Sequence, residues 1–317
     1  MELSTVKQNV PVKDLTFGQR LAADLKRNKE LYLMVIPVIA FYIIFHYGPI
    51  YGAVIAFKTY APAKGVLGSP WVGFKHFQDF FQSYYFWRLI RNTLTISVTS
   101  LVFGFPAPII LALMINELRS KYFSRTVQTI TYMPHFVSMV VICGMIVQFT
   151  KDTGVVTTFL SFFGMAKETM LNDPNKFVPI YVTSGIWQEV GWGSIIYLAA
   201  LTGIDQELYE AARIDGAGRW KQTLYITIPC LVPTIIILFI LRMGSMLNVG
   251  FEKIILLYNP ATYEKADVIS SFVYRKGIQE FSWSFSAAVG LFNSVINFAL
   301  VMTSNWISRK TSETSLF

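Results

Sequence analysis

The sequence has few of the residues on which catalysis and metal binding depend. It contains only three histidines and two cysteines in 317 residues. His46, His76 and His135 fall in separate segments, without the i, i+4 spacing or the cysteine neighbours of a zinc site, so we expect no metal centre. Cys143 and Cys230 lie in different apolar runs and are expected to be too far apart to bridge.

Two sequence motifs of enzymes are also missing. There is no Gly-x-x-x-x-Gly-Lys-Ser/Thr phosphate-binding loop, so the chain is not expected to bind ATP by itself, and any energy from ATP must come through a partner. No Gly-x-Ser-x-Gly segment marks a serine nucleophile. We therefore predict a protein that is not an enzyme and carries no cofactor of its own.

Charged residues are scarce as well, at 15% of the chain, whereas hydrophobic residues make up 53% and the mean hydropathy is +0.46. In a soluble domain about a quarter of the residues are charged, so this composition indicates a chain embedded in lipid. The formal net charge is +8, but the basic residues are scattered among loops and tails and form no stripe. Anionic membrane lipid is therefore the expected partner, and nucleic acid is not.

Long apolar runs dominate what is present. Six of them occupy residues 31–52, 92–116, 126–149, 178–201, 229–250 and 284–308. Each reaches the roughly 20 residues that a helix needs to cross the hydrocarbon core of a bilayer. These runs predict an all-α integral membrane protein with six transmembrane helices in one domain, residues 31–308. Residues 1–30 would form a cytosolic tail in front of this domain, and residues 309–317 a short cytosolic tail behind it.

The N-terminal tail has the pattern of a basic amphipathic helix. Thr16 and Gln19 have the spacing of a capping box. Phe17, Leu21 and Leu25 recur every four residues beside lysines and arginines, which is typical of a helix lying on an anionic leaflet. A frayed leader with accidental spacing is the alternative. The basic cluster directly before the first run favours a cytosolic N-terminus, and an even number of spans puts the C-terminus on the same side.

The most informative segment is a polar loop between the fourth and fifth runs, residues 202–228. It contains Glu210-Ala211-Ala212 and then Asp215-Gly216-Ala217. Glycine readily takes the left-handed conformation that ends a helix, so we expect a short helix that stops at Gly216. A second short helix, over about residues 219–227, would lead to Pro229, which can open the next span because the first helical position needs no backbone donor. This pattern predicts a docking element.

This loop resembles the coupling motif of binding-protein-dependent ABC importer permeases, which reads Glu-Ala-Ala, three residues, Gly, nine residues, Ile-x-Leu-Pro. In this chain Ile226 and Pro229 match, and Ile228 replaces the usual leucine. Asp215-Gly216-Ala217 and the upstream Leu198-Ala199-Ala200-Leu201 with Tyr209 resemble the carbohydrate-uptake, maltose-type branch. Further likenesses at residues 71–74, 92–93, 287–291 and 307–310 extend the resemblance over nearly the whole chain from Leu31 onward.

The resemblance implies a type I, maltose-type permease fold with a cytosolic coupling helix, in the bacterial cytoplasmic membrane with both termini in the cytosol. It implies that an ATPase-coupling site is formed by Glu210, Ala211, Ala212, Asp215, Gly216, Ala217 and Pro229. The implied partners are a second, similar permease subunit forming a heterodimer and two ATPase subunits that bind ATP and magnesium. An extracellular or periplasmic solute-binding protein would face the outer connection at residues 251–283.

Polar and aromatic side chains within the runs mark a candidate substrate path. Glu189 and Arg242 fall near the middle of spans four and five, where an isolated charge is costly, so we predict that they pair, either beside the path or as a structural tie. A sugar path needs amides that bond hydroxyl groups and flat aromatic faces. The candidate set is Gln148, Trp187, Gln188, Glu189, Arg242, Asn248, Asn293 and Asn297. Asn and Gln also hydrogen-bond helices together in lipid, which is the alternative role for the amides.

These observations predict the permease subunit of an ATP-driven importer for oligosaccharides or complex glycans, which moves solute by alternating access. The alternative is a six-span channel or a secondary transporter that ATP does not drive. The sequence shows no inverted repeat and no helix breaks at the membrane midplane, both of which are common in secondary transporters. No span carries a continuous polar stripe of the kind that an ion pore uses.

Overall fold

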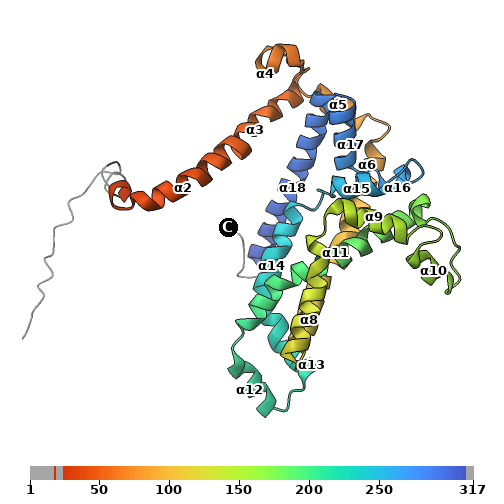
Figure 1. Cartoon of the computed structure of the whole chain (residues 1–317). Helices are drawn as coiled ribbons and strands as arrows, with labels where there is room; N and C mark the ends of the chain where they lie inside the picture. Colours follow the sequence, from red (N-terminus) through yellow and green to blue (C-terminus); the bar gives the residue numbers. More distant parts are fainter. Residues whose placement is uncertain (1–17, 19–23, 312–317) are drawn as a thin grey trace, which may run out of the picture. The chain divides into compact units, whose positions relative to one another are not determined.

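The computed structural model describes Gly18 and residues 24–311, and Figure 1 traces its helices. Within these residues the chain forms helices joined by turns and has no strand, only an isolated antiparallel bridge between Lys58 and Trp71. The prediction of an all-helical protein is confirmed. The predicted helix of the N-terminal tail depends mainly on Thr16, Phe17, Gln19 and Leu21, which lie outside the described residues.

The chain divides into two compact units, residues 1–54 and residues 55–317. In the first unit, α2 (Lys29–Tyr42) continues through η1 (Ile43–Tyr47) and α3 (Gly48–Ile50). No residue of α2 is buried in the described structure, although most of its side chains are large and apolar. A helix that is hydrophobic all round is typical of a membrane span, and α2 falls in the first predicted run.

The remaining helices follow in the second unit, which η2 (Tyr51–Phe57) enters from the first. In chain order they are η3 (Pro62–Lys64), α4 (Gly65–Gly68), α5 (Lys75–Phe81), α6 (Phe86–Thr99), η4 (Ser100–Gly104), α7 (Pro106–Asn116), α8 (Lys121–Tyr132), η5 (Met133–Phe136), α9 (Met139–Phe149), α10 (Val155–Ser161), η6 (Met170–Asn172), α11 (Pro174–Thr202), α12 (Gln206–Ile214), α13 (Arg219–Gln222), η7 (Thr223–Thr227), α14 (Ile228–Gly244), α15 (Phe251–Leu257), α16 (Tyr263–Ala266), α17 (Ile269–Tyr274), η8 (Arg275–Gln279) and α18 (Trp283–Thr311). Figure 1 shows α12 and α13 at one end of this unit and α5, α16 and α17 at the other.

Helix length and composition support four or five of the six predicted spans. The four clear candidates in the described residues are Lys29–Phe57, Phe86–Asn116, Arg219–Gly244 and Trp283–Lys310. A fifth is the pair Lys121–Phe136 and Met139–Phe149, which is bent by 100°. α11 has 29 residues but is not among the candidates. We attribute this to polar residues such as Gln188 and Glu189 in its middle, which lower its hydropathy.

Three π-helical turns precede prolines that interrupt long helices. η1 comes just before Pro49, η4 before Pro106 and η7 before Pro229. Proline has no amide hydrogen to donate to the preceding turn, and membrane helices tolerate it through local π adjustments of this kind. The prediction that Pro229 opens a new helix is therefore wrong, because α13, η7 and α14 form one continuous helix, Arg219–Gly244.

α11 packs against α7, α8 and α14 in the second unit. Its closest approach is at Gly191, where an added Cβ would overlap the backbone carbonyl of Thr131 in α8. Two residues further on, a Cβ at Gly193 would lie 3.0 Å from Cγ of Pro108 in α7. Small residues let membrane helices pack with their backbones in contact. These two glycines therefore fix the position of α11 between its neighbours.

A buried carboxylate ties the connection that follows α14 to α6. Asp267 is fully buried, and its Oδ2 accepts hydrogen bonds from Arg275 at 2.8 Å and from Arg88 of α6 at 3.2 Å. Asn92 of α6 donates its Nδ2 hydrogen to the backbone oxygen of Asp267 at 2.9 Å. Burial lowers the pKa of Arg275, but its hydrogen bond to Asp267 and the charge of that carboxylate outweigh this and leave the pKa above its ordinary value. This connection is thus anchored to α6 and does not hang free.

We predict that Gly191→Ala destabilises the protein, because a methyl group at this position meets backbone, which cannot rotate away. Overpacking of this kind typically costs about 1–3 kcal/mol. The melting temperature of the purified protein and its abundance in membranes should both fall. Gly290→Ala in α18 is the matched control, since nothing lies within 4 Å of a Cβ there and alanine favours a helix over glycine. Equal stability of the two variants would contradict the close packing of α11 on α8.

Candidate functional site: a docking loop and a central cavity

The predicted docking loop folds as the short helix α12. Asp205 caps its start, because its Oδ1 accepts a hydrogen bond at 3.0 Å from the amide two residues further on. Gly216 follows its end in the left-handed conformation, with φ of 77°. The Ala217 amide donates to the Ala212 carbonyl at 2.8 Å, and the Gly216 amide donates at 3.0 Å to the carbonyl three residues back. This pair of bonds is the Schellman motif, so the predicted stop at Gly216 is confirmed.

Side-chain bonds hold this loop to the membrane helices on either side. The hydroxyl of Tyr209 in α12 lies 2.9 Å from Oγ1 of Thr227, which is buried in η7. Arg219, at the start of α13, forms an ion pair at 3.5 Å with Glu117, which directly follows α7. α12 is therefore connected by contacts, and not only by the chain, to the helix that continues into α14.

The outer surface of the loop combines acids with exposed apolar side chains. Glu210 and Asp215 are exposed. Ile214 is 87% exposed and Trp220 is 79% exposed, although both are large and apolar. Exposed apolar surface bordered by charge is typical of a site that contacts another protein. This surface suits the docking role that the sequence predicts.

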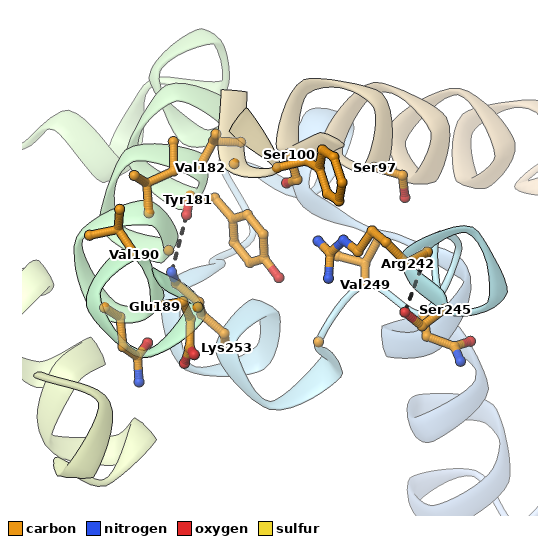
Figure 2. Close-up of a pocket in the computed structure, with 18 of the residues that line it drawn as sticks. Ser97, Ser100, Tyr181, Val182, Glu189, Val190, Arg242, Ser245, Val249 and Lys253 are labelled. Carbon is orange, nitrogen blue, oxygen red and sulfur yellow. Dashed lines mark hydrogen bonds between the residues drawn. The ribbon is translucent and has the colours of Figure 1, made fainter. Parts of the chain in front are cut away.

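A cavity of about 600 Å³ lies between α6, α7, α11 and α14, and Figure 2 shows part of its lining. Its volume falls in the range usual for small-molecule sites. Four of the eight predicted path residues line it: Gln188 and Glu189 from α11, Arg242 from α14 and Asn248 from the segment after α14. Most of the other lining residues are apolar or serine, so the cavity wall is mainly apolar and carries only a few charged or amide groups.

The other four predicted path residues are not part of the cavity lining. Asn293 and Asn297 of α18 each donate an Nδ2 hydrogen to Oδ1 of Asn248, at 2.9 Å and 3.0 Å. Asn293 and Asn297 therefore position Asn248 without lining the cavity themselves. This agrees with the alternative role of the amides, in which they hydrogen-bond helices together. Gln148 and Trp187 are exposed, and neither lines this cavity.

The predicted pair between Glu189 and Arg242 is wrong. Nδ1 of His135 lies 2.9 Å from Oε2 of Glu189, and the His135 ring stacks on Trp192 with 4.5 Å between ring centres. The guanidinium of Arg242 forms no hydrogen bond or ion pair with any residue that the structure describes. The prediction assumed straight helices at matched depth. The turn η5, at the 100° bend between α8 and α9, instead brings His135 to the Glu189 side of α11.

The helix break after α14 was also not predicted. α14 ends at Gly244, and residues 245–250 are non-helical before α15 begins. Broken backbone at such a site needs other hydrogen-bond partners, and the Leu247 amide donates to Oδ1 of Asn297 at 3.0 Å. The break falls in the last six residues of the apolar run 229–250, and the absence of helix breaks at the membrane midplane stays a prediction. The non-helical residues form one wall of the cavity.

Tyr181, Glu252 and Lys253 are among the cavity residues that the sequence did not predict. Lys253 is only 4% exposed; its Nζ donates to the Tyr181 carbonyl at 3.1 Å and lies 4.8 Å from the centre of the Tyr181 ring. Burial lowers the pKa of Lys253 to about 8, while Cys143 and Glu189 act in the opposite direction. Lys253 belongs to α15, outside the candidate spans. It lies in the connection of residues 251–283, which is polar enough for its sequence to predict a solvated loop. A single lysine followed by Ile-Ile-Leu-Leu was the available signal.

The described part of the chain has no metal-binding cluster and no disulfide. No group of three or more His, Cys, Asp or Glu side chains there could hold a metal ion. Cys143 is buried, Cys230 is exposed, and both are free.

Comparison with known proteins identifies the family. Residues 104–313 match the family described as "Binding-protein-dependent transport system inner membrane component". The chain belongs to this family. The permease is 44% identical to Protein LplB of Bacillus subtilis (strain 168) over the full length of both chains. It is 41% identical to the polygalacturonan/rhamnogalacturonan transport system permease protein YteP of the same organism, over 94% of each chain.

Solved structures confirm the type I importer permease fold. The permease is 48% identical, with a TM-score of 0.85, to a chain of a bacterial ABC transporter involved in the import of the acidic polysaccharide alginate; the match covers 92% of the permease and 99% of that chain. A chain of a bacterial alginate ABC transporter in complex with an alginate pentasaccharide-bound periplasmic protein gives 48% identity and a TM-score of 0.86, over 94% and 100%. The MetNI methionine ABC transporter, at 16% identity and a TM-score of 0.51, shares the fold alone.

A pair of double-mutant cycles tests the charge pairing in the cavity. We predict that His135→Ala and Glu189→Gln affect the melting temperature of the purified permease non-additively, because the two side chains are in contact. Arg242→Gln and Glu189→Gln should be additive within error, because the structure has no contact between them. The reverse result, coupling with Arg242 and none with His135, would restore the pair that the sequence suggested.

Proposed function

We propose that this permease is one membrane subunit of an ATP-driven importer that moves oligosaccharides inward by alternating access. The observation that carries the proposal is the match to the alginate importer over nearly the whole chain, at an identity well above the level where only the fold is shared. The name of YteP, a polygalacturonan/rhamnogalacturonan permease, points to the same class of solute. More distant relatives carry the names of arabinooligosaccharide and lactose permeases. These relatives thus agree on saccharides and divide on their charge, whereas a further relative, at 26% identity, is named as an sn-glycerol-3-phosphate permease.

The proposed assembly has the partners that the resemblance implies. A solute-binding protein would deliver the saccharide from outside, since one alginate transporter was solved in complex with a periplasmic protein that holds an alginate pentasaccharide. A second, similar permease subunit would complete the membrane domain as a heterodimer, since the apolar surface of α2 is left uncovered within its own unit. Two ATPase subunits would bind ATP and magnesium, since this chain has no phosphate-binding loop.

We also propose the finer topology of six spans, with both termini in the cytosol of a bacterial cell and residues 31–308 as the membrane domain. In this proposal the bent pair α8–α9 is the third span and α11 is the fourth. The support is length: α11 has 29 residues, ample for a crossing of roughly 20. Its polar middle would be tolerated because it faces the cavity and not lipid. The tails at residues 1–30 and 309–317 keep their proposed cytosolic location.

The ATPase-coupling role of the loop remains a proposal, and its mechanics follow from the contacts of α12. The proposed coupling site consists of Glu210, Ala211, Ala212, Asp215, Gly216, Ala217 and Pro229. When the ATPases close, they would push α12, whose Tyr209 is bonded to Thr227. Thr227 belongs to the helix that continues as α14, and α11 leads directly into α12. The push would therefore move α14 and α11 together as a unit, in a shear of packed helices.

A channel or secondary transporter is the less supported alternative. The helix break after α14 weakens one argument against a secondary transporter, since broken helices are common in that class. The stronger argument is the exposed docking loop, because a transporter that ATP does not drive has no ATPase to receive it. The family match weighs on the same side.

The docking role predicts that Gly216→Val uncouples ATP hydrolysis from uptake while the permease still inserts and folds. Valine at φ of 77° is strained, by roughly 1–2 kcal/mol for a left-handed non-glycine residue, so the end of α12 should shift. Glu210→Ala should act in the same direction, more weakly. Gly218→Val is the matched control, since Gly218 has φ of −68° and open space around its Cβ. Normal uptake in vesicles that contain the Gly216→Val variant would contradict the proposed docking role of the loop.

Reconstitution tests the function as a whole. Vesicles that contain the full complex should accumulate saccharide only when the binding protein and ATP are both present. The permease alone in a planar bilayer should pass no steady ion current, because the cavity wall lacks the rings of charge or carbonyls of an ion pore. Saccharide uptake without ATP would instead favour the secondary transporter.

A further inference from the structure

The cavity holds four charged side chains, and their pairing is unequal. Two are acids, Glu189 and Glu252, and two are cations, Arg242 and Lys253. Glu189 accepts a hydrogen bond from His135. Among the residues that the structure describes, neither acid forms an ion pair with either cation. The formal charges balance in number, yet both cations are left without a carboxylate.

Lys253 is the more buried of the two cations. An ammonium group has three hydrogens to donate, and among the described residues only one acceptor bonds it, the Tyr181 carbonyl at 3.1 Å. The Tyr181 ring gives a further cation–π contact at 4.8 Å. A buried charge without a counter-ion is unfavourable, and proteins keep such groups mainly at functional sites. Gly185 provides the room, because a Cβ there would lie 3.4 Å from Nζ.

Arg242 is the cation that a solute in the cavity can reach. It is exposed on the cavity side of α14, two residues before the helix ends at Gly244, and its guanidinium has no protein partner in the described residues. In Figure 2 the Tyr181 ring stands between Lys253 and Arg242. A planar guanidinium matches the two oxygens of a carboxylate and binds it through two parallel hydrogen bonds.

We propose that Arg242 binds the carboxylates of an acidic saccharide, one built from uronate units, as it passes through the cavity. Lys253 acts behind the Tyr181 ring as a fixed positive charge that makes this wall favourable for an anion. Asn248, held by Asn293 and Asn297, lies on the same non-helical wall as a partner for hydroxyl groups. This assignment rests on the proposed import of oligosaccharides and adds the chemical class of the sugar.

The test uses the full complex in vesicles with its binding protein and ATP. Two probes are compared: oligogalacturonate, and the same oligomer with every carboxyl reduced to an alcohol. Arg242→Gln should lower oligogalacturonate uptake by about tenfold or more, the scale expected for losing a charge-assisted hydrogen bond. Uptake of the reduced oligomer should change by less than about twofold. Arg242→Lys, which keeps the charge, should recover part of the loss.

Glu252→Gln is the variant matched to Arg242→Gln, because it also removes one charge from the cavity lining, here the negative charge next to Lys253. It should raise oligogalacturonate uptake, since it removes negative charge from the wall. ATP hydrolysis stimulated by the binding protein is measured for every variant and should persist in Arg242→Gln, which shows that the complex still assembles. Lys253→Gln should reduce acidic uptake less than Arg242→Gln does.

Two results would overturn this assignment alone. One is an equal loss of uptake for both probes in Arg242→Gln, which would make the residue structural. The other is a wild-type complex that imports neutral saccharides with ATP but no uronate oligomer, which would leave the proposed importer intact and refute only its acidic substrate. If the wild-type complex imports no saccharide with ATP, the proposed function itself fails, and this assignment fails with it.

Discussion

The close contact of α11 with α8 is the constraint on which the cavity and the docking loop both depend. At Gly191 no side chain separates the two backbones. The residues just before this contact, Gln188 and Glu189, line the cavity, and the end of α11 leads through Asp205 directly into α12. A helix with a larger residue at this point would stand further from α8. The cavity wall and the loop would then move with it, since both are built on the same helix.

Much of the fold could be predicted because lipid imposes strong and simple rules on a sequence. Long apolar runs in lipid form helices, and glycine after a short polar helix commonly takes the left-handed turn seen at Gly216. The interruptions could not be predicted. The bend between α8 and α9 and the end of α14 at Gly244 fall inside runs whose hydropathy is continuous. Such breaks are stabilised by contacts from elsewhere, here Asn297 bonding the Leu247 amide, and hydropathy carries no record of them.

The sequence predicted several of the residues that make up the candidate site, but not which charged side chains pair with each other. Polar residues at mid-run depth do gather around one cavity, and Gln188, Arg242 and Asn248 are among its lining residues. The predicted pair of Glu189 and Arg242 was based on equal depth in straight helices. The bend between α8 and α9 instead places His135 next to Glu189. Lys253 was missed for a related reason. Its segment looks solvated in the sequence, whereas the fold returns it against Tyr181.

The long helix that ends beside the cavity determines how a push at the loop would reach the solute. From Arg219 to Gly244 it is continuous over 26 residues, which spans roughly 39 Å at 1.5 Å per residue. Its first turn borders the docking loop, and its last turn carries Arg242. Beyond Gly244 the chain is non-helical, so it can change shape, but Asn248 is bonded to α18 through Asn293 and Asn297. In the proposed cycle a rigid rod would thus carry movement from the ATPase side to the cavity. There the non-helical residues 245–250, bonded to α18 through Leu247 and Asn248, would convert it into a change in the wall that faces the solute.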